Sequence, residues 1–200
     1  MGERIINKAR ELYFSFGLKS VTMDALAKET GISKKTLYQH FTDKDEIIDV
    51  VVADLLESHQ QQIESCRSAA TNVVHEVHLQ LTAILTLFLD IRPAFFNEMQ
   101  KYFPEVWTKM IDHEKSTLLA GIQSNLQRGI AEGYYRNDLN TEITSLFRIN
   151  QIRSLFNPAS YQIPHFEIKK LAFELTSLYL HAITNADGRV LIKEYSESQL

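Results

Sequence analysis

Hydrogen-bonding side chains crowd the segment TGISKKTLYQHF, residues 30–41, which is long enough for about two helical turns. On a helix, Leu37 and Phe41 would share the buried side, whereas Lys35 and Gln39 would face away from it. Lysine can donate to O6 and N7 of guanine, and glutamine can bind adenine through two hydrogen bonds. The segment therefore carries the chemistry of a surface that reads DNA bases.

Other polar groups near this segment suit phosphate oxygens. Thr36 and Tyr38 would flank the outward face, and the backbone amides at the start of the helix can also hold phosphates. Lys44 would lie in the first turn of the following helix, where a cation opposes the helix dipole by a few tenths of a kcal/mol. A phosphate docked beside Lys44 would remove that conflict.

The preceding residues predict the element that would position this helix. Thr22 can cap a short helix, Gly31 supplies the permissive backbone of a sharp turn, and Ser33 can cap the helix that follows. Small Ala27 would let the two helices cross closely. This is a helix-turn-helix pattern, whose second helix would enter the DNA major groove. The alternative is a short, solvated surface helix; the spacing of Ala27, Gly31 and Leu37 favours DNA binding.

Composition places the chain among globular helical proteins. Its 200 residues are 44% hydrophobic, and seven Gly and four Pro are few for an all-β fold with many tight turns. The single cysteine, Cys66, excludes an internal disulfide. We expect neither a membrane span nor a signal peptide, and therefore a cytoplasmic protein. The formal net charge of -4 does not by itself indicate nucleic acid, so DNA binding must depend on local arrangement.

Apolar residues recur at helical spacing along almost the whole chain. We expect an all-α protein of about nine helices, with a loop at 157–164 and a polar tail after Gly188. The expected helices cover residues 5–16, 23–30, 33–41, 43–66, 73–91, 93–102, 104–132, 141–156 and 168–183.

The stretch VTMDALAKETGISKKTLYQHFTDKDEII, residues 21–48, resembles the N-terminal signature of TetR-family transcriptional regulators. The resemblance is dense over residues 5–50 and otherwise rests on layout. It implies a homodimer with a helix-turn-helix domain at 1–46 that binds a palindromic operator, and a ligand-binding and dimerisation domain at 47–200. Lys34 and Lys35 stand where many members carry one small residue, which bears on base preference. By motif position, the implied DNA contacts are Thr22, Lys34, Lys35, Thr36, Tyr38, Gln39, His40 and Lys44.

Aromatic and methionine side chains cluster in the middle of the chain, where the resemblance implies a ligand cavity. Such side chains are also common in a core, so both interpretations stay open. A cavity lined by them would take an apolar or aromatic effector. The residues assigned to it are Phe88, Phe96, Met99, Trp107, Met110 and Phe147.

The last two expected helices, 141–156 and 168–183, have broad apolar faces. The resemblance implies that two such pairs form a four-helix dimer bundle. Arg148, Asn150 and Arg153 would supply polar groups at that interface or in the cavity.

Other motifs are weaker indications of function. His75 and His78 are one helical turn apart and could bind a metal with His59 or His113, but they complete no recognised motif. We therefore expect no metal, no cofactor and no catalytic site. The sequence predicts a ligand-responsive regulator, a repressor released by its effector. The alternatives are a helical sensor of small molecules without operator control and a helical enzyme with a family-like N-terminus.

Overall fold

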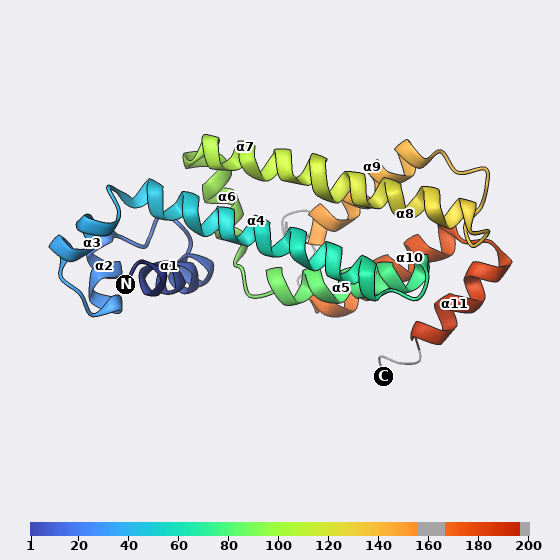
Figure 1. Ribbon diagram of the computed structural model, residues 1–200, viewed down its shortest axis with the longest axis horizontal. Coiled ribbons are helices and arrows are strands. Elements are labelled where there is room, and N and C mark those ends of the chain that lie inside the picture. Colours follow the sequence, from blue (N-terminus) through green and yellow to red (C-terminus); the bar gives the residue numbers. More distant parts are fainter. Residues whose placement is uncertain (156–166, 197–200) are drawn as a thin grey trace. The chain divides into compact units, whose positions relative to one another are not determined.

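The computed structural model describes residues 1–155 and 167–196, and its regular elements in these ranges are helices (Figure 1). In the same ranges an isolated antiparallel β-bridge pairs Tyr135 with Thr184. The predicted all-α class is confirmed. The elements are α1 (Gly2–Phe16), α2 (Met23–Thr30), α3 (Lys34–His40), α4 (Lys44–Ala69), α5 (Val73–Phe88), α6 (Pro93–Tyr102), α7 (Pro104–His113), the π-helical segment η1 (Glu114–Leu119), α8 (Ala120–Ala131), α9 (Thr141–Leu155), α10 (Ile168–Ile183) and α11 (Ala186–Ser196).

The chain divides into two compact units. Unit 1 combines Met1–His59 with Phe88–His113, and unit 2 combines Gln60–Leu87 with Glu114–Leu200. Two helical stretches pass from one unit to the other along the chain: α4, and the uninterrupted run α7, η1 and α8.

Unit 1 is built around the apolar stripe of α1, which packs on α2 and α6. Ile5 and Ala9 are fully buried, and Leu37 of α3 and Phe95 of α6 are equally inaccessible. Burying a large apolar side chain such as Ile5, Leu37 or Phe95 stabilises the unit by about 1.5–3 kcal/mol. Burial also raises the pKa of the Tyr13 hydroxyl, because its anion would be poorly solvated there.

The core of unit 2 joins the start of α5 to α8, α9, α10 and α11. Tyr135 is 2% exposed, and its hydroxyl donates to Asn125 Oδ1 at 2.9 Å. Gly129 of α8 faces this ring so closely that a Cβ there would lie 2.1 Å from Tyr135 Cδ2. Glycine is thus required at this helix position by contact with a neighbour.

Two expectations about the helices need correction. The helix predicted over 104–132 is continuous, but six of its residues, η1, adopt the wider π-helical geometry, which the periodicity of side chains does not reveal. The polar tail expected after Gly188 is instead the second half of α11, in which Ile192 is buried and Tyr195 stacks on His75 with ring centroids 4.5 Å apart. With α7, η1 and α8 counted as one run, the described ranges hold one helix beyond the nine expected, α11.

One expected loop lies outside the described residues, and the end of one predicted helix differs by a few residues. The loop at 157–164 and Phe156 lie outside the described residues. The helix predicted to stop near Cys66 continues to Ala69. The pair proposed for dimerisation corresponds to α9 and α10, and α11 follows it. Among the helices described, none alone is long and apolar enough to cross a membrane; α5 and α6 pass the length and composition test only together, across a 76° bend.

Candidate nucleic-acid interface

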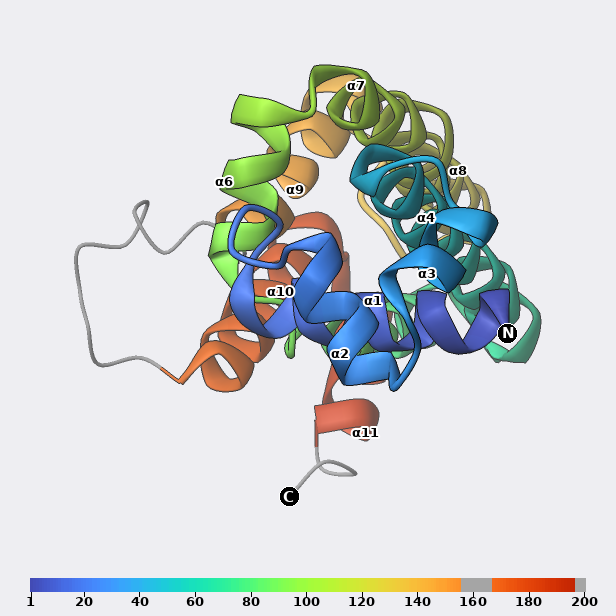
Figure 2. The ribbon, with the colours of Figure 1, turned by 90° about the vertical axis from the view of Figure 1, so that its left-hand side faces the viewer.

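The turn between α2 and α3 has the geometry that the sequence predicted. Gly31 adopts a left-handed conformation at φ 67°, which a glycine reaches without steric cost. Its amide donates to Lys28 O, and the next amide, that of Ile32, donates to Ala27 O at 3.0 Å. These bonds satisfy carbonyls at the end of α2 and turn the chain sharply into α3, which lies beside α2 (Figure 2).

Helix α3 is anchored from one side. Ser33 caps it by accepting a hydrogen bond from the Thr36 amide at 3.0 Å. Leu37 is fully buried and Phe41 is 9% exposed, as the predicted wheel required. A helix of seven residues is too short to be stable alone, so these two side chains fix its orientation.

The side of α3 away from Leu37 presents polar groups to solvent. Lys35, Gln39 and His40 are exposed, and Tyr38 is 47% exposed. Thr36 is half-buried, with its hydroxyl 2.8 Å from that of Ser33. The structure therefore places the six predicted contacts of α3, residues 34–36 and 38–40, on one short helix. The opposite side of that helix is held in the core by Leu37.

Lys34 has a partner that sequence reasoning missed. Its ammonium lies 2.7 Å from the Asp24 carboxylate, and this hydrogen bond raises the pKa of Lys34. Asp24 is the second residue of α2, an acidic position that favours the start of a helix. That local role was readable from the sequence, but the pairing depends on the angle between α2 and α3.

The two predicted contacts outside α3 lie at the starts of the helices that flank it. Thr22 caps α2, since its hydroxyl accepts from the Ala25 amide at 3.1 Å. Lys44 begins α4 and is half-buried, with its ammonium 3.4 Å from Lys19 O. Burial lowers the pKa of Lys44, and the charge of Glu98 partly opposes this effect.

The loop between α1 and α2 is tied to α6 within unit 1. The Lys19 amide donates to Glu98 Oε2 at 2.6 Å, and the Lys19 ammonium lies 4.8 Å from the centroid of the Tyr102 ring. Gly17, at φ 85°, brings the backbone close to the same carboxylate. These contacts hold the carbonyl that Lys44 approaches, so α6 helps to place one of the predicted phosphate contacts.

The residues predicted to line a ligand cavity fall into two groups. Five of them belong to unit 1: Phe88 and Met99 are buried, and Phe96, Trp107 and Met110 are half-buried. The sixth, Phe147, belongs to unit 2 and is 55% exposed on α9.

Two histidines adjoin the aromatic side chains of unit 1. His59 meets the edge of Phe88 at a centroid distance of 5.3 Å, and its Nδ1 lies 3.0 Å from His113 Nε2. Burial, together with the charge that His113 can carry, lowers the pKa of His59 to about 4. At neutral pH His59 is therefore uncharged. Within the ranges described, no group of three or more potential ligands is placed to hold a metal.

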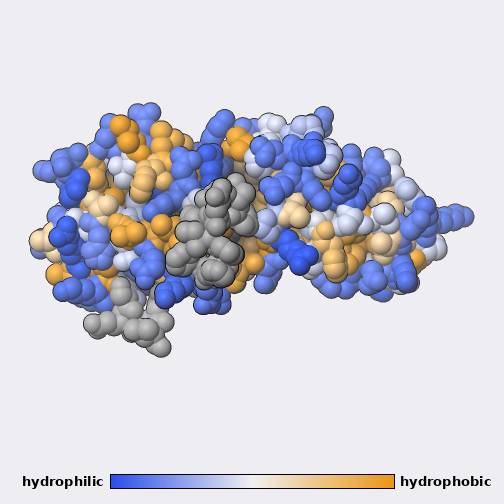
Figure 3. Space-filling view, turned by 180° about the vertical axis from the view of Figure 1, so that it is seen from behind, coloured by the Kyte–Doolittle hydropathy of each residue, from blue (hydrophilic) through white to orange (hydrophobic). Residues whose placement is uncertain are grey.

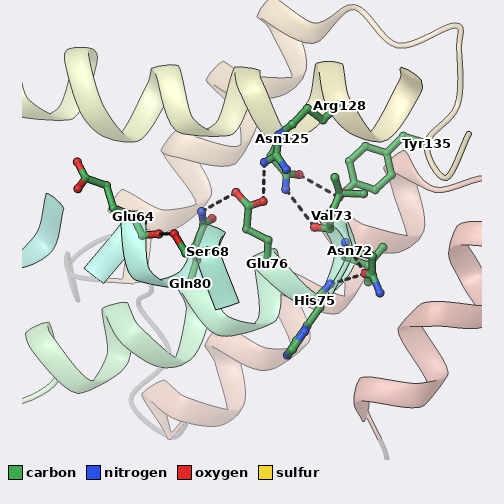
Figure 4. A network of polar contacts seen from close by, with 11 residues as sticks. Glu64, Ser68, Asn72, Val73, His75, Glu76, Gln80, Asn125, Arg128 and Tyr135 are labelled. Atoms are coloured by element: carbon green, nitrogen blue, oxygen red, sulfur yellow. Dashed lines mark hydrogen bonds and ion pairs between the residues drawn. The ribbon is translucent and has the colours of Figure 1, made fainter. Parts of the chain in front are cut away.

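A polar network in unit 2 was not predicted (Figure 4). The buried Glu76 carboxylate pairs with Arg128 at 2.5 Å and accepts from Gln80 at 3.2 Å. Beside it, Asn125 donates to Val73 O at 3.0 Å. Sequence reasoning could see Glu76 only as a charge on an apolar helix, because its partner is 52 residues away.

The N-terminal segment matches a known protein family. Residues 5–51 match the family described as bacterial regulatory proteins, tetR family. This range contains α2, α3 and the start of α4, and thus all eight predicted DNA contacts.

Relatives extend the similarity beyond this segment. The uncharacterised HTH-type transcriptional regulator YhgD of Bacillus subtilis is 29% identical over 133 residues, which cover 64% of this chain and 69% of that protein. The HTH-type transcriptional repressor KstR2 of Mycolicibacterium smegmatis is 24% identical over 159 residues, 72% of each chain.

A solved structure resembles the fold over most of its length. A transcriptional regulator from Saccharomonospora viridis, solved in complex with choline, aligns with a TM-score of 0.75 at 17% identity, covering 92% of this chain and 97% of that one. At this identity the likeness shows a shared fold.

Proposed function

The chain belongs to the TetR family of transcriptional regulators, and we propose that it is a ligand-responsive repressor that binds a palindromic operator as a homodimer. Its relatives are regulators and not enzymes. Residues 1–46 are assigned to DNA binding, and 47–200 to effector binding and dimerisation. A protein with this role works where its operator lies, in the cytoplasm.

One observation carries the operator assignment: α3 exposes a continuous polar face while Leu37 and Phe41 hold its other side in the core. Lys35 and Gln39, at the centre of that face, are assigned to base edges. Thr22, Lys34, Thr36, Tyr38, His40 and Lys44 are assigned to phosphates or to the edge of the base-reading surface.

The dimer is assigned to α9 and α10, which carry apolar side chains on two sides. Arg148 and Ile149 of α9 point into the core, whereas Ile143 and Phe147 are 66% and 55% exposed. On α10, Leu178 is 64% exposed. Figure 3 views the molecule from the side of these helices and shows apolar side chains among the polar ones at its surface. An exposed apolar face of this kind supports self-association.

The second copy is needed because one short reading helix makes few contacts. Two copies would place two such helices about one turn of DNA apart or slightly more, in a two-fold arrangement that matches a palindrome. Phe147, which the sequence assigned to the cavity, is assigned here to the dimer face.

The effector is proposed to act through α4. This helix has 26 residues, about 39 Å, and runs from Lys44 in unit 1 to Ala69 in unit 2. An effector that binds better to one tilt of α4 would shift the spacing of the reading helices, since a ligand shifts an equilibrium only through differential affinity. A coupling of 1–3 kcal/mol would loosen operator binding about 5–150-fold.

The aromatic side chains of unit 1 that the sequence assigned to the cavity, Phe88, Phe96 and Trp107, are the proposed apolar contacts of that effector. Phe96→Ala or Trp107→Ala should then blunt the response to inducer while operator affinity stays nearly unchanged. Joint loss of stability and DNA binding in both variants would mean that these side chains serve the core alone.

Selection from random-sequence duplex DNA with the full-length chain tests the proposed function. Enrichment of one palindromic site is the expected result. Enrichment of nothing, in a folded protein that still binds small molecules, would favour the sensor without operator control.

A further inference from the structure

The core of unit 2 holds a positive charge for which the described residues provide no negative partner. Arg148 of α9 is 7% exposed, and its guanidinium donates to Gln151 Oε1 and Thr176 Oγ1, each at 3.1 Å. Its third neighbour is the Tyr179 ring, 4.7 Å from the guanidinium carbon to the centroid. All three are neutral groups, and buried charges in proteins are ordinarily paired with an opposite charge.

Burying the guanidinium of Arg148 has an electrostatic cost. Burial lowers the pKa of its guanidinium to about 10, and the opposing influences come from two tyrosines, Tyr179 and Tyr135. The contrast with Arg153, one turn further along α9, is clear. Arg153 is exposed and its guanidinium donates to both carboxylate oxygens of Glu114.

A second buried polar side chain without a partner lies in unit 2. His78 of α5 is 8% exposed, and both of its ring nitrogens are buried without a hydrogen-bond partner among the described residues. Burial, followed by the charges of His75 and Arg148, lowers the pKa of His78. Buried polar groups without partners are rare in folded proteins, so the unpaired charge of Arg148 and the unbonded imidazole of His78 need an explanation.

We propose that Arg148 anchors a site for the anionic group of a small organic molecule, a carboxylate or a phosphate. A carboxylate would give the guanidinium a charged, two-bond partner. The surrounding core, with Tyr179, Leu180 and Ile183, is apolar, so the rest of the ligand would pack against apolar side chains. This inference rests on the proposed function and assigns the effector to unit 2. The aromatic side chains of unit 1 are a separate candidate, and the Arg148→Met, Phe96→Ala and Trp107→Ala variants distinguish the two.

The site also explains a residue type that a stable core would not otherwise select. Replacing a buried charge by an apolar side chain of similar volume is often neutral or stabilising. An arginine at such a position is consistent with a ligand that requires it.

Thermal unfolding of the full-length protein tests the site without DNA. Octanoate and inorganic phosphate serve as probes, with chloride at equal ionic strength as the reference. We expect octanoate at about 100 times its Kd to raise the unfolding midpoint by several degrees. Arg148→Met, which should fold because it removes a buried charge, should abolish that shift. Arg136→Met, at an exposed arginine of the same unit that pairs with Asp138, should keep it. A phosphate shift that is lost in Arg148→Met would support the same site with phosphate as its ligand group.

Equal shifts in the wild type and in Arg148→Met, or no shift with either probe, would overturn the site. Operator titration then separates this inference from the proposed function. Octanoate should weaken operator binding by the wild type about 5–150-fold. Stabilisation by octanoate without any change in operator affinity would overturn its role as effector and leave operator recognition intact.

Discussion

The buried imidazole of His59 should make unit 1 sensitive to mild acid. His59 titrates at about 4 in the folded protein against 6.5 in the unfolded chain, because burial and His113 disfavour its charged form. A histidine whose pKa is lower in the folded protein binds fewer protons there than in the unfolded chain. Its contribution to stability is therefore complete above pH 6.5 and is lost as pH falls toward 4.

The magnitude follows from the two pKa values. Linkage gives a loss of about 2 kcal/mol in the free energy of unfolding between pH 7 and pH 5 from this group alone. His113 has a pKa lowered by burial and adds an effect of the same sign. A loss of this size is a large fraction of the stability of an ordinary domain.

The assay is urea unfolding at pH 7 and pH 5, at one protomer concentration because the protein is proposed to dimerise. Trp107, the one tryptophan of the chain, belongs to the same unit as His59 and reports on it by fluorescence. His59→Gln keeps a polar group beside His113 but does not titrate. The wild type should lose about 2 kcal/mol more than this variant over the interval. Equal losses in the two proteins would show that the pKa of His59 is not lowered by folding.

Three further predictions concern the interface, the reading helix and the core. Leu178→Asp should produce folded monomers, since its side chain is 64% exposed in the protomer; an unchanged mass in sedimentation would locate the dimer face elsewhere. Asp24→Asn should tighten binding to all DNA about two- to fivefold at low salt, because it releases Lys34 and removes a negative charge; unchanged affinity would contradict this. Gly129→Ala should cost about 3 kcal/mol in urea unfolding, because its methyl group would overlap the Tyr135 ring; a neutral effect would contradict the close approach.

Gly121→Ala is the matched control for the last of these. It lies on the same helix, and a Cβ there would meet nothing nearer than Ile63 Cγ2 at 4.0 Å. Helix propensity then dominates, and the substitution should stabilise by about 0.5–1 kcal/mol.

The reading helix was predictable because its determinants are local. Ser33 and Gly31 act on backbone groups within four residues of themselves, and the wheel that buried Leu37 depends only on helical period. The π-helical segment was not predictable, since it differs from an α-helix in backbone bonding and keeps helical side-chain spacing.

Features that depend on residues far apart in the chain could not be predicted from the sequence. Glu76 forms an ion pair with a residue 52 positions away, and the burial of Arg148 depends on how α9 and α10 pack. The sequence predicts a tail where helix α11 lies, because polar residues outnumber apolar ones after Gly188. Among the described residues of α11, Ile192 is buried. The place of this helix is fixed by Tyr195, which stacks on His75, a contact that no periodicity predicts.

The most direct test of operator reading by α3 is a comparison of base preferences in variants. Selection from random duplexes should be repeated with Gln39→Ala and Lys35→Ala, with Lys44→Ala as the phosphate-contact control. Gln39→Ala and Lys35→Ala should relax preference at particular base pairs, symmetrically in both half-sites, each at a cost of about 1–3 kcal/mol. Lys44→Ala should weaken binding to all sequences alike and flatten the salt dependence by about one unit of slope. An unchanged consensus in the Gln39 and Lys35 variants, or an altered consensus in the Lys44 variant, would contradict operator reading by α3.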